Sequence, residues 1–204
     1  MRLTEKQNDL YKGIRNNTLT VVHGPAGTSK TFTSCYTALS LLADKKIDKI
    51  IITKPIQESG EQIGLLPGTV SEKIDPYKQS YYTNFCKILD RPTIDWLFSM
   101  EAIVFEPLAY MRGWNVDNTI LVFEEAQNAT PSQIKLLLTR IGFNSKFFIS
   151  GDLEQSDKYR DKTKSGLYDA KMRLQDVKGI GIFEFGIQDI VRNPIIGEIL
   201  NRYD

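Results

Sequence analysis

Residues 18–31 read Thr-Leu-Thr-Val-Val-His-Gly-Pro-Ala-Gly-Thr-Ser-Lys-Thr. This stretch begins as a short β-rich run and passes directly into a glycine-rich loop that ends on Lys30 and Thr31. Such a loop, between a strand and a helix, presents backbone N–H groups and a helix N-terminus to phosphate. The lysine neutralises the β- and γ-phosphates, and the threonine hydroxyl binds Mg²⁺. The stretch therefore predicts an α/β fold with a nucleoside triphosphate site.

The loop departs from the usual pattern at one position. The pattern G-x-x-x-x-G-K-[ST] has glycine where this chain has Ser29. Glycine adopts positive φ angles freely, whereas serine at positive φ costs about 1 kcal/mol and adds a hydroxyl donor. The alternative interpretation is an ordinary glycine-rich turn. The residues expected to bind the nucleotide are Gly24, Pro25, Ala26, Gly27, Thr28, Ser29, Lys30, Thr31 and Phe32.

Length and composition indicate a single globular domain over residues 1–204. The chain is 41% hydrophobic and 25% charged, and its length allows a full core. No apolar run reaches the roughly 18 residues of a membrane helix, and the polar N-terminus does not resemble a signal peptide. We therefore expect a cytoplasmic protein with no membrane partner, in which Cys35 and Cys86 are reduced thiols. The net charge of +1 means that any nucleic-acid contact must come from a local patch.

Apolar runs separated by helical patterns predict an alternating α/β chain. Strands are expected at 18–23, 49–53, 102–105, 119–123, 146–150 and 181–185. Helices are expected at 4–16, 30–43, 70–98 with a break near Pro92, 130–141 ended by Gly142, 165–175 and 189–202, with a loop at 60–68. This alternation predicts a mostly parallel sheet covered on both faces, with ligands bound at the carboxyl ends of its strands.

Two acids follow the apolar run at 119–123. Glu124 is placed to hold Mg²⁺ through its water shell, and Glu125 to orient and deprotonate an attacking water. The first acid is usually Asp, and the extra methylene of Glu makes its reach to Mg²⁺ less direct. The alternative is a pair of solvated acids after a strand.

Polar residues also follow the run at 146–150. Ser150, Asp152 and Gln155 lie at this strand end, where Gln155 is placed to sense the γ-phosphate or to position water. The alternative is a simple Gly-Asp turn.

Taken together, these segments resemble the PhoH-like protein family, whose members have a single RecA-like P-loop ATPase core related to superfamily 1 helicases. The matching segments lie at 24–31, 52–55, 59–68, 106–113, 123–128, 138–142, 151–157 and 189–192. They follow the family's order and cover nearly the whole chain. The resemblance implies a three-layer α/β/α P-loop NTPase fold with a mostly parallel central sheet, and ATP and Mg²⁺ as cofactors. The short, altered sequence would suit a phage-encoded member.

The chain departs from the family pattern at four positions. Ser29 replaces glycine, Glu124 replaces aspartate, Lys54 replaces arginine and Asn193 replaces histidine. The first two lie at the phosphate and Mg²⁺ sites, so they bear on the rate of hydrolysis more than on nucleotide binding.

The resemblance also implies roles for Gln7 and for an arginine of the matching segments. Gln7 would read the adenine edge, since an amide pairs with both N6 and N7, although Thr4 and Gln7 also fit a helix capping box. An arginine finger would come from a neighbouring subunit of a homo-oligomeric ring, with a hexamer favoured by the family. Arg192 is the preferred finger over Arg140 and Arg112.

Nucleic acid is the partner that the resemblance implies, as RNA or single-stranded DNA. In helicase cores the segment corresponding to 54–55 touches the single strand, and downstream aromatic and basic residues suit base stacking and phosphate contact. These residues are Tyr77, Lys78, Tyr81 and Tyr82, although Tyr77 and Tyr81 also have the spacing of half-buried packing residues. His23 is the only histidine, so we expect it to be structural.

Three functions are compatible with this sequence. The first is an ATPase that couples hydrolysis to action on RNA or single-stranded nucleic acid in a helicase-like manner. The second is a nucleotide or small-molecule kinase, which needs an acceptor pocket and a mobile arginine-rich lid, and no such segment is found in the sequence. The third is a nucleotide-bound assembly module with little or no hydrolysis, which the altered Ser29 and Glu124 would suit.

Overall fold

A single parallel sheet forms the centre of the molecule. The computed structural model describes residues 3–55, 70–156, 158–193, 195, 198–199 and 202, with the backbone alone for 70–77. Within these ranges, six strands pair in the order β3-β2-β4-β5-β1-β6, and every pairing is parallel. The strands are β1 Leu19–His23, β2 Lys49–Thr53, β3 Ile103–Phe105, β4 Thr119–Phe123, β5 Lys146–Gly151 and β6 Ile180–Glu184.

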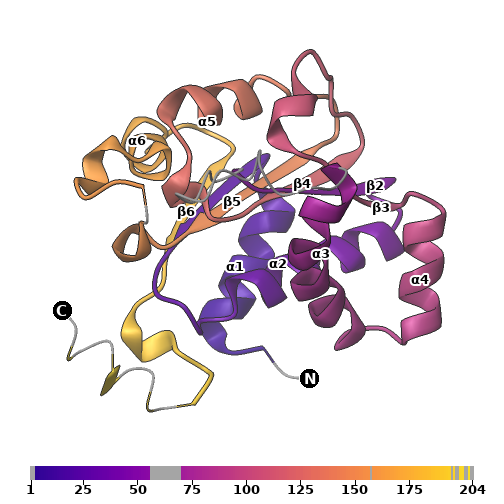
Figure 1. Cartoon of the computed structure of the whole chain (residues 1–204), viewed down its shortest axis with the longest axis horizontal. Helices are drawn as coiled ribbons and strands as arrows, with labels where there is room; N and C mark the ends of the chain where they lie inside the picture. The colour runs from indigo at the N-terminus through magenta and orange to yellow at the C-terminus, as the bar shows by residue number, and fades with distance from the viewer. Residues whose placement is uncertain are drawn as a thin grey trace.

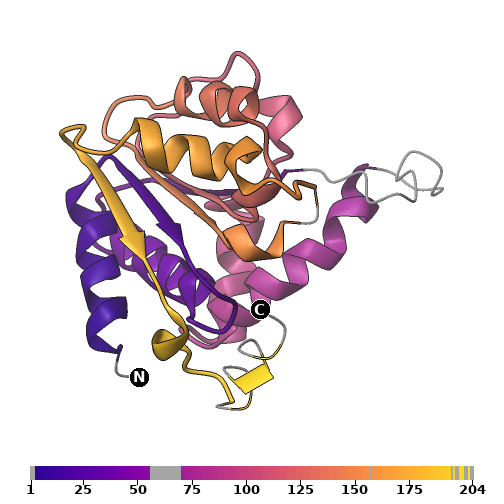
Figure 2. The same ribbon diagram turned by 90° about the vertical axis from the view of Figure 1, so that its left-hand side faces the viewer.

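Helices cover both faces of this sheet (Figure 1). They are α1 Glu5–Asn16, α2 Lys30–Ala43, α3 Val70–Cys86, α4 Arg91–Ser99, α5 Pro131–Leu138 and α6 Gly166–Arg173. Figure 2 shows α5 and α6 on one face, with α1, α2 and α3 on the other. The predicted three-layer α/β/α architecture is therefore confirmed.

The alternation of side chains along β4 explains why the sheet needs cover on both faces. Ile120 and Val122 belong to the core shared with α1–α4, whereas Leu121 and Phe123 belong to the core under α5 and α6. Successive side chains of a strand point to opposite faces, and strands buried on both faces are continuously apolar. All five β4 residues are accordingly buried.

The strand order brings the predicted motifs together. Strands β2, β4, β5 and β1 are consecutive neighbours and run in the same direction. Their carboxyl ends therefore lie at one edge, where Lys54 follows β2, Glu124 follows β4 and the glycine-rich loop follows β1. The helix α2 begins at Lys30, as predicted.

The ends of two predicted helices differ in the structure. The break before α4 comes at 87–90, and Pro92 lies in the first turn of α4, where it is tolerated. The helix α5 ends at Leu138 and not at Gly142. Ile141 instead forms a bridge with Val116, and an added Cβ on Gly142 would lie 2.6 Å from the Val116 carbonyl oxygen. Gly142 is therefore used for close backbone approach and not as a helix cap.

The predicted C-terminal helix does not begin at Asp189. Residues Ile187–Asp189 form a short 3₁₀ helix, η6, and 190–193 are irregular. The reason is a backbone hydrogen bond in which the Val191 N–H donates to the Gly27 carbonyl at 3.0 Å, which ties this segment to the loop after β1. The predicted loop at 60–68 and most of 194–204 lie outside the described residues. No helix in the described part of the chain is long and apolar enough to cross a membrane.

Candidate functional site

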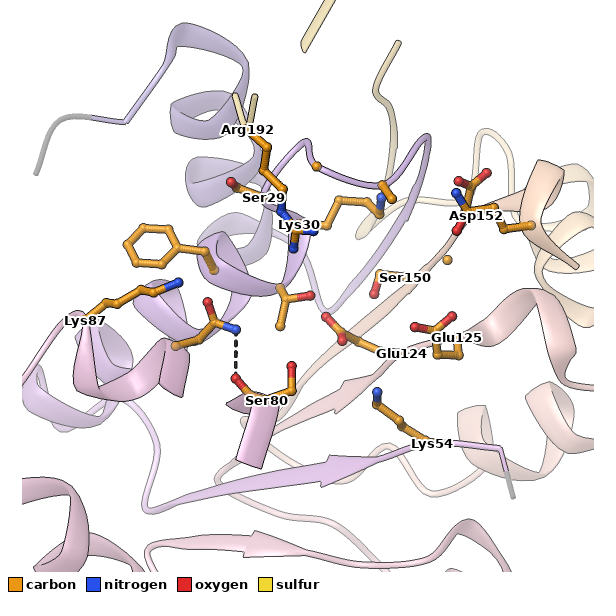
Figure 3. A pocket seen from close by; sticks show the side chains of 17 residues that line it. Ser29, Lys30, Lys54, Ser80, Lys87, Glu124, Glu125, Ser150, Asp152 and Arg192 are labelled. Carbon is orange, nitrogen blue, oxygen red and sulfur yellow. Dashed lines mark hydrogen bonds between the residues drawn. The ribbon is translucent and has the colours of Figure 1, made fainter. Parts of the chain in front are cut away.

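A cavity of about 340 Å³ opens at the carboxyl edge of the sheet. Its wall combines the ends of β2, β4 and β5, the loop after β1, one face of α3, and Arg192 (Figure 3). All predicted catalytic and metal-binding residues line it, namely Lys30, Thr31, Glu124, Glu125, Gln155 and Arg192. Of the other residues predicted to bind nucleotide, Ala26, Gly27, Ser29 and Phe32 also line it, whereas Gly24, Pro25, Thr28 and Gln7 do not.

The glycine-rich loop has the backbone of a phosphate cradle. Gly24 has φ +147° and Gly27 has φ +88°, and an added Cβ on Gly24 would lie 2.3 Å from the Phe185 carbonyl oxygen. These positions accept glycine alone without strain. The loop runs into α2, so its N–H groups and the helix N-terminus both serve the cavity.

Lys30 supplies the positive charge at the centre of this loop. Its Nζ donates to the carbonyl oxygens of Gly24 at 2.7 Å and Pro25 at 2.9 Å. Burial lowers the pKa of Lys30, and the nearby carboxylates, Asp152 foremost, oppose that shift. The ammonium therefore faces three acids in a partly desolvated site, which suits it to a polyphosphate.

Glu124 is a buried carboxylate with one oxygen atom that makes no hydrogen bond within the described residues. It is 6% exposed, and its Oε1 has no hydrogen-bond partner among the described residues. Burial raises the pKa of this carboxyl, while Lys54 and the hydroxyl of Thr31 oppose the rise. Thr31 and Glu124 together fit Mg²⁺, which is commonly held by one or two protein oxygens with substrate phosphates. No group of three His, Cys, Asp or Glu side chains suited to a metal occurs in the described ranges.

Glu125 is held by a residue that the sequence analysis missed. The Nε2 of Gln127 donates to Oε2 of Glu125 at 2.8 Å, and its Oε1 accepts from the Asp152 N–H at 3.1 Å. Gln127 is 2% exposed, and Glu125 itself has a left-handed backbone, with φ +57°. Gln127 thus ties the end of β4 to the end of β5 and orients the second acid. Its place in the Glu-Ala-Gln-Asn segment was the available signal.

The end of β5 adds a third polar group to the cavity. Asp152 is 7% exposed, and its Oδ2 has no partner among the residues described. Burial raises the pKa of this carboxyl, and the neighbouring Lys30 opposes the rise. Ser150 and Gln155 line the same wall. The segment is therefore part of the site and not only a turn.

Arg192 lies in the cavity of its own chain. The 190–192 segment crosses the loop, so that a Cβ on Gly27 would lie 3.6 Å from Cδ of Arg192. Figure 3 shows Arg192 beside Ser29 and Lys30. The C-terminal segment thus returns over its own loop in this chain, and the reach of this arginine to a neighbouring subunit stays a prediction. Arg140 donates instead to the Trp114 carbonyl at 3.1 Å, and neither Arg140 nor Arg112 lines the cavity.

Comparison with known proteins agrees with this geometry. The family model described as "PhoH-like protein" matches residues 1–204. The chain belongs to the PhoH-like protein family. It is 41% identical over 199 residues to a PhoH-like protein of Bacillus subtilis (strain 168), covering 98% of this chain and 59% of that protein. It is 35% identical to protein PhoH of Escherichia coli (strain K12), covering 98% of this chain and 56% of the relative.

The chain spans less than two thirds of the length of these PhoH-like relatives. Among solved structures, the large terminase of a thermophilic bacteriophage superposes with a TM-score of 0.65 at 9% identity, over 100% of this chain and 51% of the terminase chain. A second crystal form of that terminase gives a TM-score of 0.62. The PhoH-like chain therefore has a P-loop fold of this type.

The Ser29 departure from the PhoH-like pattern has a measurable cost. Ser29 has φ +63° and ψ 32°, and its side chain makes no cap hydrogen bond. We expect Ser29→Gly to raise the free energy of unfolding by about 1 kcal/mol. A left-handed L-residue costs roughly 1–2 kcal/mol, and the larger conformational entropy that glycine loses on folding offsets part of the gain. Urea unfolding measures the change. Ser29→Ala is the control, since it keeps the Cβ and the strain. An equal gain in Ser29→Ala would show that φ is not the cause.

Two of the three aromatic residues expected to stack on nucleic acid make other contacts in the structure. Tyr81 is 1% exposed and packs edge-on against Phe105, with ring centres 5.6 Å apart. The prediction that a base stacks on Tyr81 is therefore wrong, because its side chain packs in the core with residues of α4 and β3. The Tyr82 hydroxyl donates to Asp95 at 2.7 Å, and the side chain of Tyr77 lies outside the described residues. Lys54 does line the cavity.

His23 is a buried titratable side chain of this PhoH-like chain. It is buried at the end of β1, with Nε2 3.3 Å from Oε2 of Glu184. Burial and the charges of Lys171 and Lys30 lower its pKa, and Glu184 opposes them. As expected, His23 lies in the core and not in the cavity.

This shift predicts a pH dependence of stability. Because the folded chain binds the His23 proton less readily than the unfolded chain does, the unfolded state holds more protons, and stability falls as pH drops below 6.5. His23→Gln should flatten thermal melting temperatures across about pH 5.5–7.5, the range in which histidine titrates. An unchanged slope in His23→Gln would contradict the assignment.

Proposed function

We propose that this protein is a Mg²⁺-dependent ATPase that couples hydrolysis to action on RNA or single-stranded DNA in a helicase-like manner. The observation that carries the proposal is the convergence of Lys30, the Glu124–Glu125 pair and Arg192 on one cavity. A phosphate cradle, a metal-holding acid, a water-activating acid and a cation are the parts that phosphoryl transfer to water requires.

Each cavity residue has a separate role in this reaction. Lys30 neutralises the β- and γ-phosphates, while Thr31 and Glu124 hold the cation, which when bound neutralises charge on the phosphate oxygens. Glu125 orients the attacking water and takes its proton, and Gln127 holds that carboxylate in place. Gln155 contacts the γ-phosphate.

Arg192 completes the proposed site from within the chain. It stabilises the charge that develops on the γ-phosphate, as a cis arginine does. A homo-oligomeric ring, with the hexamer favoured by family resemblance, is therefore not needed to supply this cation. We retain the ring as a separate proposal, together with a cytoplasmic location.

The base subsite is proposed to include Gln7. Its Oε1 accepts from the Thr4 N–H at 3.1 Å, and its N–H donates to the Thr4 hydroxyl at 3.3 Å, so the capping box is formed. Gln7 must therefore reach adenine without, or in exchange for, this hydrogen bond. Loss of preference for ATP over GTP in Gln7→Ala would support the role.

The second candidate is a nucleotide-bound assembly module with little or no turnover. Two observations favour it, the strained Ser29 in the cradle and the longer first acid, Glu124. Phosphate release assays of the purified protein with Mg²⁺, with and without single-stranded RNA, separate the candidates. Turnover that RNA accelerates supports the motor. Tight ATP binding without turnover supports the module, and turnover indifferent to RNA and single-stranded DNA contradicts the nucleic-acid part.

A further inference from the structure

Two of the buried oxygen atoms without partners belong to Tyr81 of α3 and to Glu124 at the end of β4. The hydroxyl of Tyr81 and Oε1 of Glu124 make no hydrogen bond within the described part of the chain, although the two residues are only 1% and 6% exposed. Nearly all buried polar groups in native proteins have a partner, because desolvation without a hydrogen bond is costly. The Tyr81 hydroxyl is a donor and the Glu124 oxygen is an acceptor, so the two atoms are suited to pair with each other.

The position of the Tyr81 ring is defined by contacts with Phe105 and Lys54. Its ring lies edge-on against Phe105 of β3, and Nζ of Lys54 lies 5.6 Å from its ring centre. Lys54 itself lines the cavity and points toward Glu124 (Figure 3). Within this packing, the Tyr81 hydroxyl lies close enough to Glu124 to oppose the rise that burial causes in the pKa of that carboxyl.

Glu124 needs such a restraint more than an aspartate would. Its additional methylene adds a rotatable bond between the backbone and the carboxylate. Mg²⁺ tolerates little deviation from octahedral geometry, and metal-ligating carboxylates are usually oriented by hydrogen bonds from neighbouring groups. The Thr31 hydroxyl is on the metal side of this carboxylate in the proposed function, so a second donor must come from elsewhere.

We propose that Tyr81 is a positioning residue of the metal site, whose hydroxyl donates to Oε1 of Glu124 when the cation binds and holds the carboxylate for it. This inference rests on the proposed function of Glu124 and Thr31 as metal-holding residues. It gives α3 a part in cation binding and explains why this buried position of α3 holds a tyrosine and not a phenylalanine.

The test compares Tyr81→Phe with the natural chain. Mn²⁺ binding is titrated by electron paramagnetic resonance in the presence of a non-hydrolysable ATP analogue, and binding of the analogue alone is measured in EDTA. We expect Tyr81→Phe to weaken Mn²⁺ binding about tenfold and to leave metal-free binding of the analogue unchanged. Thermal unfolding without metal should be unchanged or shifted upward, since the variant removes an unpaired buried hydroxyl.

A matched control removes a tyrosine hydroxyl elsewhere. The Tyr11 hydroxyl lies 3.2 Å from Oγ of Ser40, about three helical turns from the start of α2, and Tyr11→Phe should leave Mn²⁺ binding unchanged. A second comparison places Tyr81→Phe in a Glu124→Asp background. We expect a smaller loss of Mn²⁺ affinity there, because the shorter acid withdraws from the hydroxyl.

Three outcomes would overturn the inference. Natural Mn²⁺ affinity in Tyr81→Phe would do so while leaving the proposed function intact. A lower melting temperature without a change in Mn²⁺ binding would assign Tyr81 to packing alone. Failure of the natural chain to bind the analogue at all would overturn the inference and the proposed function together.

Discussion

Replacing Glu125 with glutamine is expected to lower the rate of ATP hydrolysis by about 10²- to 10⁴-fold, the usual contribution of a general base. The amide keeps the size of the side chain and an oxygen that accepts from Nε2 of Gln127, which donates to the natural carboxylate at 2.8 Å. The variant therefore removes the proton acceptor and preserves the local structure. Steady-state phosphate release with saturating Mg²⁺ and ATP measures the loss, and a fluorescent ATP analogue checks that binding remains.

Glu101→Gln is the matched control for this experiment. Glu101 is also an exposed glutamate with a left-handed backbone, at φ +54° compared with +57° for Glu125, but it lies between α4 and β3, away from the cavity. Its replacement should leave turnover unchanged. A Glu125→Gln protein that hydrolyses ATP at the natural rate would remove Glu125 from the mechanism and leave water activation to another group.

Lys30→Ala is expected to weaken ATP binding by about a hundredfold and to abolish turnover at ordinary ATP concentrations. Two charge-assisted contacts to the β- and γ-phosphates, at about 1.5 kcal/mol each, amount to roughly a hundredfold in affinity. The carboxylates that Lys30 offsets, Asp152 foremost, would also face the polyphosphate without a counter-charge. Isothermal titration with ATP and Mg²⁺ measures the loss of affinity.

Lys12→Ala serves as the control for Lys30→Ala. Lys12 is exposed on α1 and does not line the cavity, so its removal should leave ATP affinity unchanged. Melting curves show whether Lys30→Ala folds, since the lysine also bonds the carbonyls of Gly24 and Pro25. A folded Lys30→Ala protein with natural affinity for ATP would contradict the assignment of the loop as the triphosphate site.

Sequence patterns predicted those parts of this molecule that depend on local chemistry. The run at 119–123 is apolar at every position because both faces of β4 are covered, and period and composition are enough to recognise such a strand. The loop before Lys30 could be recognised from its glycines, because Gly24 and Gly27 adopt positive φ angles. The predicted strain at Ser29 follows from the same rule, and the structure confirms the positive φ.

The remaining parts depend on which distant segments meet. Gln127 is a neutral amide whose role appears only when β5 brings the Asp152 N–H to it. Arg192 lines the cavity of its own chain because the segment after η6 bonds back to Gly27, which no periodicity encodes. Tyr81 is buried because residues of α4 and β3 pack against one side of α3. Sequence alone could not place these residues relative to the cavity.

The position of β1 also determines when this molecule can become functional during synthesis. The strand pairs with β5 on one side and β6 on the other, with Leu19 opposite Phe147 and Ile180. The strand β1 thus pairs only after β5 and β6 have been synthesised, and such long-range pairing slows folding. While the ribosome is still adding residues 146–184, both edges of β1 lack their native partners. Completion of the edge that carries the loop after β1 is therefore a late event in the maturation of the nascent chain.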